Sequence, residues 1–311
     1  MSTGILIVGS GALATLFAAR LSSAGVDVTM LGTWPEGLAA LRLRGACLEG
    51  EGKFTVRATD NPADCRGAKF ALVLVKSWQT ERAAQQLADC LAEDGLAVTL
   101  QNGLGNDDIL SGILRLQRVS RGVTTLGAAL LAPGFVRLSG RGVVTLEAHP
   151  HLAALGELLR VAKFEINIVE DVQPVVWCKL MVNAAINPLT ALLRVKNGEL
   201  LANPPARELM GELARETASG AEALGVALPF SVPEHAVEEV AQSTSNNISS
   251  MLQDVLRGTP TEVDAINGAV VRKGEDKKIS TPVNQVIWSL VKALPSGVGY
   301  NLFHGSLEGG V

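Results

Sequence analysis

The sequence predicts an α/β fold in which an N-terminal doubly wound parallel sheet is followed by a C-terminal all-helical domain. Three observations support this expectation. In the first half, short apolar runs alternate with helix-like segments, and after about Asp171 the apolar positions follow a long helical period. The length of 311 residues favours two domains, because a domain averages roughly 150 residues. We therefore expect one domain over residues 1–170 and a second over residues 171–311.

The first strand is expected at Gly4–Val8, an apolar run that passes into a glycine-containing turn and a helix reaching Ser22. The apolar run Val26–Leu31 then completes a strand-helix-strand unit. A helix is also expected over Trp78–Ala92. The remaining strands are expected at Phe54–Ala58, Phe70–Val75 and Ala97–Leu100, and four later runs are expected to extend the same sheet: Gly122–Thr125, Phe135–Leu138, Val143–Leu146 and Ile166–Val169.

The second half has helical periodicity almost throughout. The helices are expected at Gln173–Leu193, Pro205–Leu224, Val232–Leu256, Pro260–Val271 and Val283–Ala293. Beyond them, the glycine-containing tail from Tyr300 to Val311 is expected to be mobile.

A glycine motif connects the first strand to the first helix. Gly9-Ser10-Gly11-Ala12-Leu13-Ala14 has the form G-x-G-x-x-A, in which the first glycine allows a tight turn and the second lets the backbone approach a pyrophosphate. The following helix N-terminus offers N–H groups to that anion. Such turns also occur in α/β proteins that bind no nucleotide. The position between a strand and a helix favours a Rossmann-type dinucleotide site formed by Gly9, Ser10, Gly11, Ala12, Leu13 and Ala14.

Composition excludes several other classes of protein. With 27 Lys and Arg against 31 Asp and Glu, the chain has no basic excess for binding nucleic acid. The first basic residue, Arg20, follows the first apolar stretch rather than preceding it, so that stretch does not resemble a signal peptide. We expect no membrane segment and a cytoplasmic protein. The four cysteines form no C-x-x-C pair and no metal-like cluster with the four histidines, so we expect reduced thiols and no metal. Oligomeric state stays open, with a homodimer as one option.

A nicotinamide enzyme that reduces a carbonyl needs a proton donor near the carbonyl oxygen. The one tyrosine, Tyr300, is not part of a Tyr-x-x-x-Lys pair, and no histidine has a carboxylate-rich setting. A lysine is therefore the leading candidate. Lys179, Asn183 and Asn187 follow one another at intervals of four, which places them on one face of an otherwise apolar helix. A solvated helix face is the alternative, but the apolar neighbours argue against it.

Five segments together resemble the signatures of the ketopantoate reductases (2-dehydropantoate 2-reductases). In chain order they are Val75–Gln79 (V-K-S-W-Q), Gln101–Gly105 (Q-N-G-L-G), Trp177–Thr190 (W-C-K-L-M-V-N-A-A-I-N-P-L-T), Asn247–Asp254 (N-I-S-S-M-L-Q-D) and Thr261–Gly268 (T-E-V-D-A-I-N-G). With the glycine motif, the resemblance runs from about residue 4 to residue 293.

This resemblance implies reduction of 2-dehydropantoate, a small 2-keto acid, to pantoate by hydride from NADPH, a step in pantothenate and coenzyme A biosynthesis. It implies that Lys179 is the general acid and that Glu262 completes the catalytic network. Lys76 is expected near the adenosine phosphate end of the cofactor, and Asn102 near the nicotinamide. The substrate-binding residues implied are Asn102, Asn183, Asn187, Asn197, Asn247 and Ser250.

Several of these residues have a simpler explanation. Glu262 ends the segment Thr259-Pro260-Thr261-Glu262, which also has the pattern of a helix capping box. Asn102-Gly103 and Asn197-Gly198 could be ordinary turns. The polar pairs 246–247 and 249–250 could be surface residues of a helix.

The sequence departs from the family at the end of the second expected strand. The family commonly has Arg there for the 2′-phosphate of NADP, whereas this chain has Met30-Leu31-Gly32-Thr33-Trp34. An acidic residue typical of NAD preference is also missing, since Asp27 precedes the strand. Lys76 could supply the countercharge, so NADP is favoured by resemblance and NAD stays open. Three alternatives remain: a reductase of another 2-keto acid, a β-hydroxyacid dehydrogenase, and a dinucleotide-sensing module without catalysis.

Overall fold

The computed structural model describes residues 4–295, which divide into two compact units. Within the described residues, unit 1 runs to Leu180 and includes Val226–Pro229, whereas unit 2 comprises Met181–Gly225 and continues from Phe230. The chain passes from one unit to the other inside helix α6, Gln173–Leu193. The domain boundary predicted after residue 170 lies just before this helix and stays a prediction. The tail from Tyr300 to Val311 lies outside the described residues.

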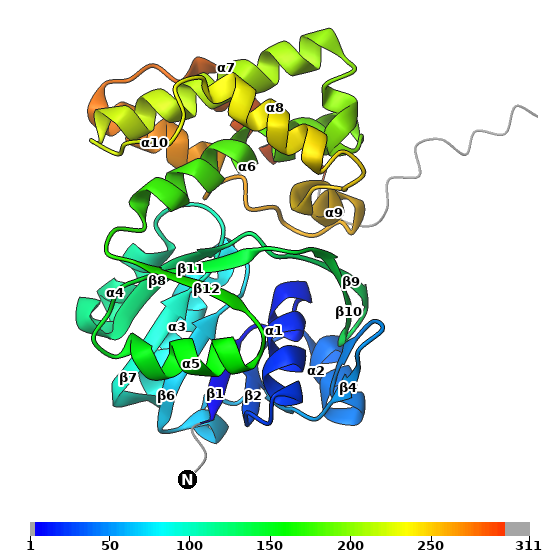
Figure 1. Cartoon of the computed structure of the whole chain (residues 1–311), viewed down its shortest axis with the longest axis vertical. Coiled ribbons are helices and arrows are strands. Elements are labelled where there is room, and N and C mark those ends of the chain that lie inside the picture. Colours follow the sequence, from blue (N-terminus) through cyan, green and yellow to red (C-terminus); the bar gives the residue numbers. More distant parts are fainter. Residues whose placement is uncertain (1–3, 296–311) are drawn as a thin grey trace, which may run out of the picture. The chain divides into compact units, whose positions relative to one another are not determined.

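Unit 1 is organised around a sheet that the described residues show to be eight-stranded, in the order β12-β11-β8-β7-β6-β1-β2-β5 (Figure 1). All its neighbouring pairs are parallel except β8 with β11. The predicted doubly wound parallel sheet is therefore confirmed. Its strands are β1 Ile5–Val8, β2 Val28–Leu31, β5 Arg57–Thr59, β6 Ala68–Val73, β7 Leu91–Thr99, β8 Val119–Thr124, β11 Val143–Glu147 and β12 Glu165–Val169.

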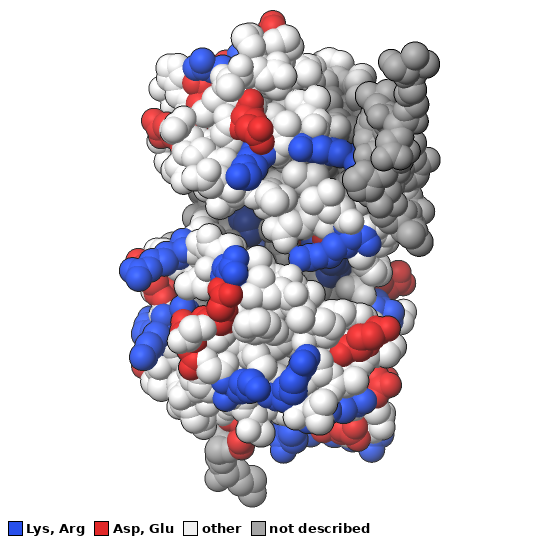
Figure 2. Space-filling model, turned by 90° about the vertical axis from the view of Figure 1, so that its right-hand side faces the viewer, with Lys and Arg blue, Asp and Glu red and all other residues white. Residues whose placement is uncertain are grey.

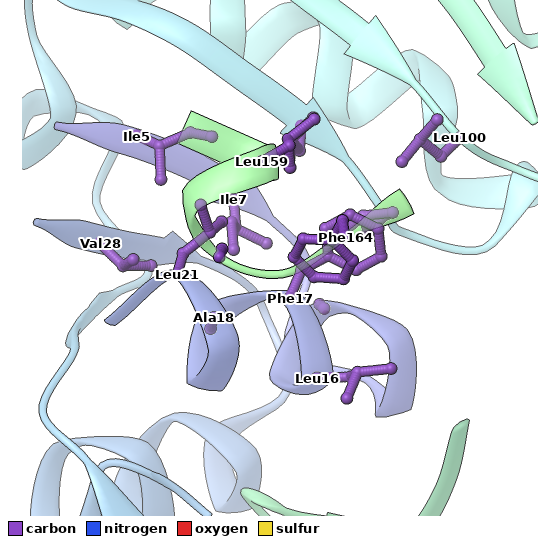
Figure 3. Close-up of a cluster of buried hydrophobic side chains, with 14 of the residues drawn as sticks. Ile5, Ile7, Leu16, Phe17, Ala18, Leu21, Val28, Leu100, Leu159 and Phe164 are labelled. Atoms are coloured by element: carbon purple, nitrogen blue, oxygen red, sulfur yellow. The ribbon is translucent and has the colours of Figure 1, made fainter. Parts of the chain in front are cut away.

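Helices cover both faces of this sheet, and the alternation of side chains along β1 separates two cores. Ile5 and Ile7 point into a core shared with Phe17, whose ring stacks on Phe164 with centroids 4.3 Å apart (Figure 3). Leu6 and Val8 belong to the opposite core, with α3 and α4. The helices of unit 1 are α1 Ala12–Ser23, α2 Pro35–Arg44, α3 Thr80–Cys90, α4 Asn106–Leu114 and α5 Leu152–Val161, with short 3-10 turns η1 Pro62–Cys65, η2 Ser77–Gln79 and η3 Leu116–Arg118.

The described residues of unit 1 also form a second sheet, of four strands, which corrects two sequence-based predictions. Its strands are β4 Gly52–Phe54, β3 Ala46–Leu48, β10 Phe135–Gly140 and β9 Gly127–Ala132, in that order across the sheet. The prediction that Phe135–Leu138 extends the main sheet was wrong. Pro133 and Gly134, the latter at φ +68°, turn the chain so that β10 pairs with β9. The single strand predicted at Phe54–Ala58 was also wrong, because the segment is divided between β4 and β5 in different sheets.

Unit 2 is built from helices in its described residues, which confirms the predicted helical domain. They are the second part of α6, η4 Asn197–Leu200, α7 Pro204–Ala223, α8 Pro233–Ser243, α9 Ser250–Leu256, α10 Asn267–Lys277 and α11 Pro282–Lys292. Their core includes Met181, Leu189, Met210, Leu213 and Val237.

Two helix predictions in unit 2 were wrong in their bounds. The helix predicted over Val232–Leu256 is two helices, because Ser249 begins a new one by accepting the N–H of Leu252 at 3.1 Å. The helix predicted from Pro260 begins at Asn267 instead. Glu262 therefore lies in the turn before α10, and the capping-box interpretation of Thr259–Glu262 was wrong.

Among the described residues, α6 is the helix long and apolar enough to cross a membrane, with a mean hydropathy of 1.3. However, 61% of its most apolar window is buried inside the protein, as in the core helix of a globular fold. On the face shown in Figure 2, Lys and Arg side chains lie among Asp and Glu with uncharged surface between them.

Candidate functional site

The carboxyl ends of four neighbouring strands form one edge of the main sheet in unit 1. Val8 at the end of β1 is in register with Leu31 of β2 and with Val73 of β6, and Val73 is in register with Thr99 of β7. The chain leaves β1 for β2 on one side, and β6 lies on the other side. Ligands of doubly wound sheets bind outside such a reversal of strand order.

The glycine motif lies in the loop after β1. Gly9 has φ +133°, and a side chain there would meet the carbonyl oxygen of Leu74 at 3.0 Å, so only glycine suits this position. Gly11 is the N-cap of α1, and a Cβ atom built on it meets no atom within 4 Å. Within residues 4–295, no side chain forms a capping hydrogen bond at the N-terminus of α1. Open space beside an uncapped helix N-terminus fits the pyrophosphate of a dinucleotide.

The loops after β6 and β7, which carry Lys76 and Asn102, are joined by a polar network. The Gln101 amide donates to the Val75 carbonyl at 3.0 Å and to the Thr80 hydroxyl at 2.8 Å. The Thr80 hydroxyl in turn lies 2.9 Å from Oδ1 of Asn106, whose amide nitrogen donates to the Asn102 carbonyl at 3.0 Å. The network holds the two predicted cofactor residues on a fixed edge. Thr80 and Asn106 lie just outside the sequence motifs, so no role was predicted for them.

At the end of β2, where a phosphate-binding Arg was expected and is missing, an arginine comes from elsewhere in the chain. Arg82, in α3, donates from Nη2 to the hydroxyl of Thr33 at 2.8 Å. The two residues are 49 positions apart. Arg82 was not predicted from the sequence, because a helix residue so far from the motif gives no local signal.

Lys179 lies in the part of α6 that belongs to unit 1. Its Nζ donates to the carbonyl oxygen of Thr124 at 2.7 Å. Thr124 is buried and ends β8, which is parallel to β7, so the ammonium group is held at the same carboxyl edge as the cofactor loops. Burial raises the pKa of the neighbouring Cys178 thiol, which keeps that thiol neutral.

The remaining candidates lie in unit 2. Asn183 and Asn187 continue the four-residue spacing from Lys179 along α6, and Asn187 is only 7% exposed. Asn247 and Ser250 flank Ser249, and the loop that carries them is tied to α6 because the Thr190 hydroxyl donates to the Ser249 hydroxyl at 2.7 Å. Both hydroxyl groups are buried.

Asn197 supports the same loop from the other side. Its backbone N–H donates to the Asn247 carbonyl at 3.1 Å, and its side-chain amide donates to the Thr244 hydroxyl at 2.9 Å. Its Oδ1 atom is buried and has no hydrogen-bond partner in the described structure. These contacts hold Asn247 in place, and a direct contact of Asn197 with substrate stays a prediction.

Two further motif residues, Pro188 and Asn267, form a structural pair. Pro188 lies inside α6 and has no N–H, so the carbonyl of Ala184, four residues earlier, loses its usual partner within the helix. The buried amide of Asn267 donates to this carbonyl at 3.0 Å and to Oδ1 of Asn284 at 3.0 Å. Both residues belong to segments that carry the family resemblance, but their positions in the sequence do not indicate this relation.

Glu262 is 5% exposed and lies in the turn that leads into α10. Its carbonyl oxygen accepts the N–H groups of Ala265 and Ile266, at 3.0 Å and 3.1 Å, which forms the turn. Glu262 therefore lies on a short irregular segment between α9 and α10 rather than on a helix face.

Comparison with known proteins agrees with this organisation. Residues 5–151 match the family model described as ketopantoate reductase PanE/ApbA, and residues 171–295 match the model of its C-terminal part. The 2-dehydropantoate 2-reductase of Archaeoglobus fulgidus is 37% identical over 94% of this chain and 98% of its own length. That of Halobacterium salinarum is 35% identical over 93% of this chain and 97% of its own length.

Solved structures agree in fold along nearly the whole chain. A PanE/ApbA family ketopantoate reductase from Ralstonia eutropha JMP134 has a TM-score of 0.88 and 31% identity, over 94% of this chain and 98% of that one. D-mandelate dehydrogenase with NADH and anilino(oxo)acetate has a TM-score of 0.86 and 25% identity, over 93% of this chain and 97% of that one.

The fold and these matches define the class, which is that of the dinucleotide-binding reductases. Within that class, the chain belongs to the ketopantoate reductase family. The family resemblance predicted from the sequence is therefore confirmed.

Proposed function

We propose that this protein reduces 2-dehydropantoate to pantoate with hydride from NADPH, as a cytoplasmic step in pantothenate and coenzyme A biosynthesis. The observation that carries the proposal is the agreement of relatives named 2-dehydropantoate 2-reductase, at up to 37% identity over 94% of the chain, across both units. The carboxyl edge of the unit 1 sheet supports the cofactor part, and the polar residues of α6 and the loops near α9 and α10 support the substrate part.

The residues of the carboxyl edge fit a dinucleotide. In the proposal, the backbone from Gly9 to Ala14 receives the pyrophosphate, because Gly11 leaves open space beside the uncapped start of α1. Lys76 lies toward the adenosine phosphates, and Asn102 lies beside the nicotinamide. When bound, the reduced nicotinamide supplies hydride to C2 of the keto acid.

The chain itself supplies the proton. In the proposal, the Lys179 ammonium donates a proton to the ketone oxygen as hydride reaches the carbon, and the neutral amine regains a proton from solvent. The bond from Nζ to the Thr124 carbonyl orients the lysine.

In the proposal, the candidate residues of unit 2 bind and orient the 2-keto acid. Asn183, Asn187, Asn247 and Ser250 offer amide and hydroxyl groups suited to the hydroxyl and carboxylate of a 2-keto acid, with Asn197 as a further contact. Glu262, fixed in the turn before α10, completes the catalytic network.

A second candidate function has one specific observation in its favour. D-mandelate dehydrogenase shares this fold at 25% identity and was solved with NADH, and β2 of the present chain ends without an arginine in Met30–Trp34. Reduction of a different, larger 2-keto acid with NADH is therefore the alternative.

One experiment separates these functions. Oxidation of NADPH and of NADH is followed with three 2-keto acids: 2-dehydropantoate, a second branched 2-keto acid and phenylglyoxylate. Reduction of NADP and of NAD is followed with 3-hydroxy acids. We expect the highest kcat/KM with 2-dehydropantoate and NADPH. Preference for phenylglyoxylate with NADH would support the alternative, and tight dinucleotide binding without turnover of any compound would indicate a sensing module.

A further inference from the structure

The end of β2 is the position at which a Rossmann-type domain distinguishes NADP from NAD. An acidic side chain there binds the ribose 2′-hydroxyl, whereas an arginine accommodates the 2′-phosphate. Here β2 ends at Leu31 and is followed by Gly32, Thr33 and Trp34, which carry no charge.

The structure places a guanidinium group at this position from a different element. Arg82 belongs to the first turns of α3, and its Nη2 donates to the Thr33 hydroxyl at 2.8 Å. Within residues 4–295, Arg82 has the Thr33 hydroxyl as a hydrogen-bond partner. Both residues are exposed. Since a guanidinium carries five N–H donors in a planar fork, one bond to Thr33 can orient it while its other donors face an anion.

Two carboxylates beyond the end of β5, the strand next to β2, have other partners. Asp60, just beyond β5, forms an ion pair with Arg42 at 3.1 Å. Asp64 accepts the Thr59 hydroxyl at 2.6 Å. Neither carboxylate is therefore placed to act as the ribose-binding acid typical of NAD preference, and Arg42 is committed to Asp60.

We propose that Arg82, oriented by Thr33, binds the 2′-phosphate of NADP(H) and replaces the arginine that β2 lacks. The inference rests on the proposed function in assuming a dinucleotide ligand. It assigns cofactor selectivity to α3 and makes Lys76, in the loop after β6, a secondary contact. Arg82 touches the cofactor, and Thr33 acts through Arg82 as a positioning residue.

The first test is calorimetric binding of adenosine 2′,5′-bisphosphate and of adenosine 5′-monophosphate, which differ in the 2′-phosphate alone. We expect Arg82→Ala to weaken binding of the bisphosphate by about 10- to 100-fold, as for loss of a charge-assisted hydrogen bond, and to change binding of the monophosphate less than about twofold. Arg82→Lys keeps the positive charge but not the planar fork of donors, so its affinity for the bisphosphate should lie between those of the unaltered protein and Arg82→Ala. Arg66→Ala, an exposed arginine before the amino end of β6, is the matched control and should change neither.

The second test reverses selectivity through Thr33. In Thr33→Asp, the new carboxylate pairs with Arg82 and can accept the ribose 2′-hydroxyl, so the ratio of kcat/KM for NADPH over NADH should fall by at least about 10-fold. Thr33→Val, which only releases Arg82, should lower this ratio less than Arg82→Ala does.

Two results would overturn the proposal. One is an equal affinity of the unaltered protein for the bisphosphate and the monophosphate. The other is an Arg82→Ala variant that still prefers the bisphosphate to the monophosphate as strongly as the unaltered protein does. Loss of that preference in Lys76→Ala would then assign the 2′-phosphate to Lys76. Because nucleotide binding needs no keto acid, failure to reduce 2-dehydropantoate would refute the proposed function and leave this result intact.

Discussion

The two units satisfy their buried polar groups in different ways. In unit 1 the ladder of the parallel sheet pairs most of the backbone, and the strands between the helix layers, such as Ile5–Val8, are apolar on both faces. In unit 2 a proline interrupts the hydrogen bonds of α6, and the buried amide of Asn267 completes them. In unit 1 the polar side chains described above form hydrogen bonds mainly at the carboxyl edge of the sheet. In unit 2 polar side chains also form hydrogen bonds in the interior.

This difference shows where substitutions should separate function from stability. In unit 1 the cofactor candidates Lys76 and Asn102 lie in loops beyond β6 and β7 and outside both cores, so they can be changed without disturbing those cores. In unit 2 the family motifs mix binding candidates, such as Asn183, with structural residues, such as Asn267 and Thr190. A motif residue of unit 2 therefore needs a stability measurement before it is assigned a role in binding.

The largest effect is expected from Lys179→Ala in unit 1. Loss of the proposed general acid should lower kcat by about 10²–10⁴ while dinucleotide binding stays nearly unchanged. Steady-state kinetics and calorimetric titration with NADPH measure the two quantities. Lys179→Arg should also be slow, because a guanidinium retains its proton at any working pH.

The matched control is Lys53→Ala, an exposed lysine of β4, which should change neither quantity. The bond to Thr124 is lost in Lys179→Ala, so a modest loss of stability, of about 0.5–1.5 kcal/mol, should accompany it. A comparable loss of cofactor affinity would instead show that Lys179 is structural or faces the cofactor.

The next largest effect tests the apolar core of unit 1. Phe17 is fully buried and stacks on Phe164, so Phe17→Ala should lower the free energy of unfolding by about 3–5 kcal/mol. Hydrogen exchange followed by mass spectrometry should show the loss of protection in unit 1 peptides. Leu43→Ala, at an 83% exposed position of α2, should stay within about 0.5 kcal/mol of the unaltered protein.

The apolar pattern of unit 1 explains what could be predicted there. β1 is a short, fully apolar run, and β6 and β7 contain the apolar runs Phe70–Val73 and Leu96–Val98. The order of these runs along the chain was enough for a parallel sheet. Helices α2, α4 and α5 were missed: α2, Pro35–Arg44, mixes charged and small residues around its circumference and gives no clear apolar face. The four-stranded sheet was missed because apolar alternation does not tell a strand which partner it has.

The placement of the candidate residues was predictable where a motif is local, and not where segments distant in the sequence meet. Lys179, Asn183 and Asn187 share one helix, and four-residue spacing alone places them on one face. Arg82 and Thr33 meet across 49 positions, and Asn267 meets Ala184 across 83, so no spacing rule brings either pair together. Roles in substrate binding and catalysis stay predictions that the kinetics above address.

A smaller effect is expected in unit 2 from Asn267→Ala. The Ala184 carbonyl and Oδ1 of Asn284 both lose a buried donor, so stability should fall by about 1–3 kcal/mol. Gln285→Ala, on an exposed position of α11, is the control and should have little effect. Urea unfolding measures the difference.

A double-mutant cycle tests whether this loss of stability depends on Pro188. Pro188→Ala restores an N–H that the Ala184 carbonyl can accept within α6, so Asn267→Ala should cost about 1 kcal/mol less in that background. An equal cost in both backgrounds would mean that Asn267 does not act through this carbonyl.

The smallest effect is expected in the rate of cysteine labelling, which compares the opening of the two units. All four cysteines precede residue 181, so each belongs to unit 1. Burial raises the pKa of Cys90 to about 12 and that of Cys65 to about 11. A folded pKa above the unfolded one means that the folded state keeps a proton that the unfolded state loses. The stability linked to these thiols is therefore complete below about pH 8.5, and it decreases as the pH rises toward the folded values.

At pH 8 the reaction of Cys65 and Cys90 with a disulfide reagent should therefore be slow and should follow opening of unit 1. Phe17→Ala should accelerate labelling several-fold, because it destabilises the unit that holds both thiols. Asn267→Ala should leave the labelling rate nearly unchanged if unit 2 can open while unit 1 stays folded. Equal acceleration by both substitutions would show instead that the two units unfold together. The apolar core of unit 1 and the buried polar contacts of unit 2 would then stabilise one cooperative structure.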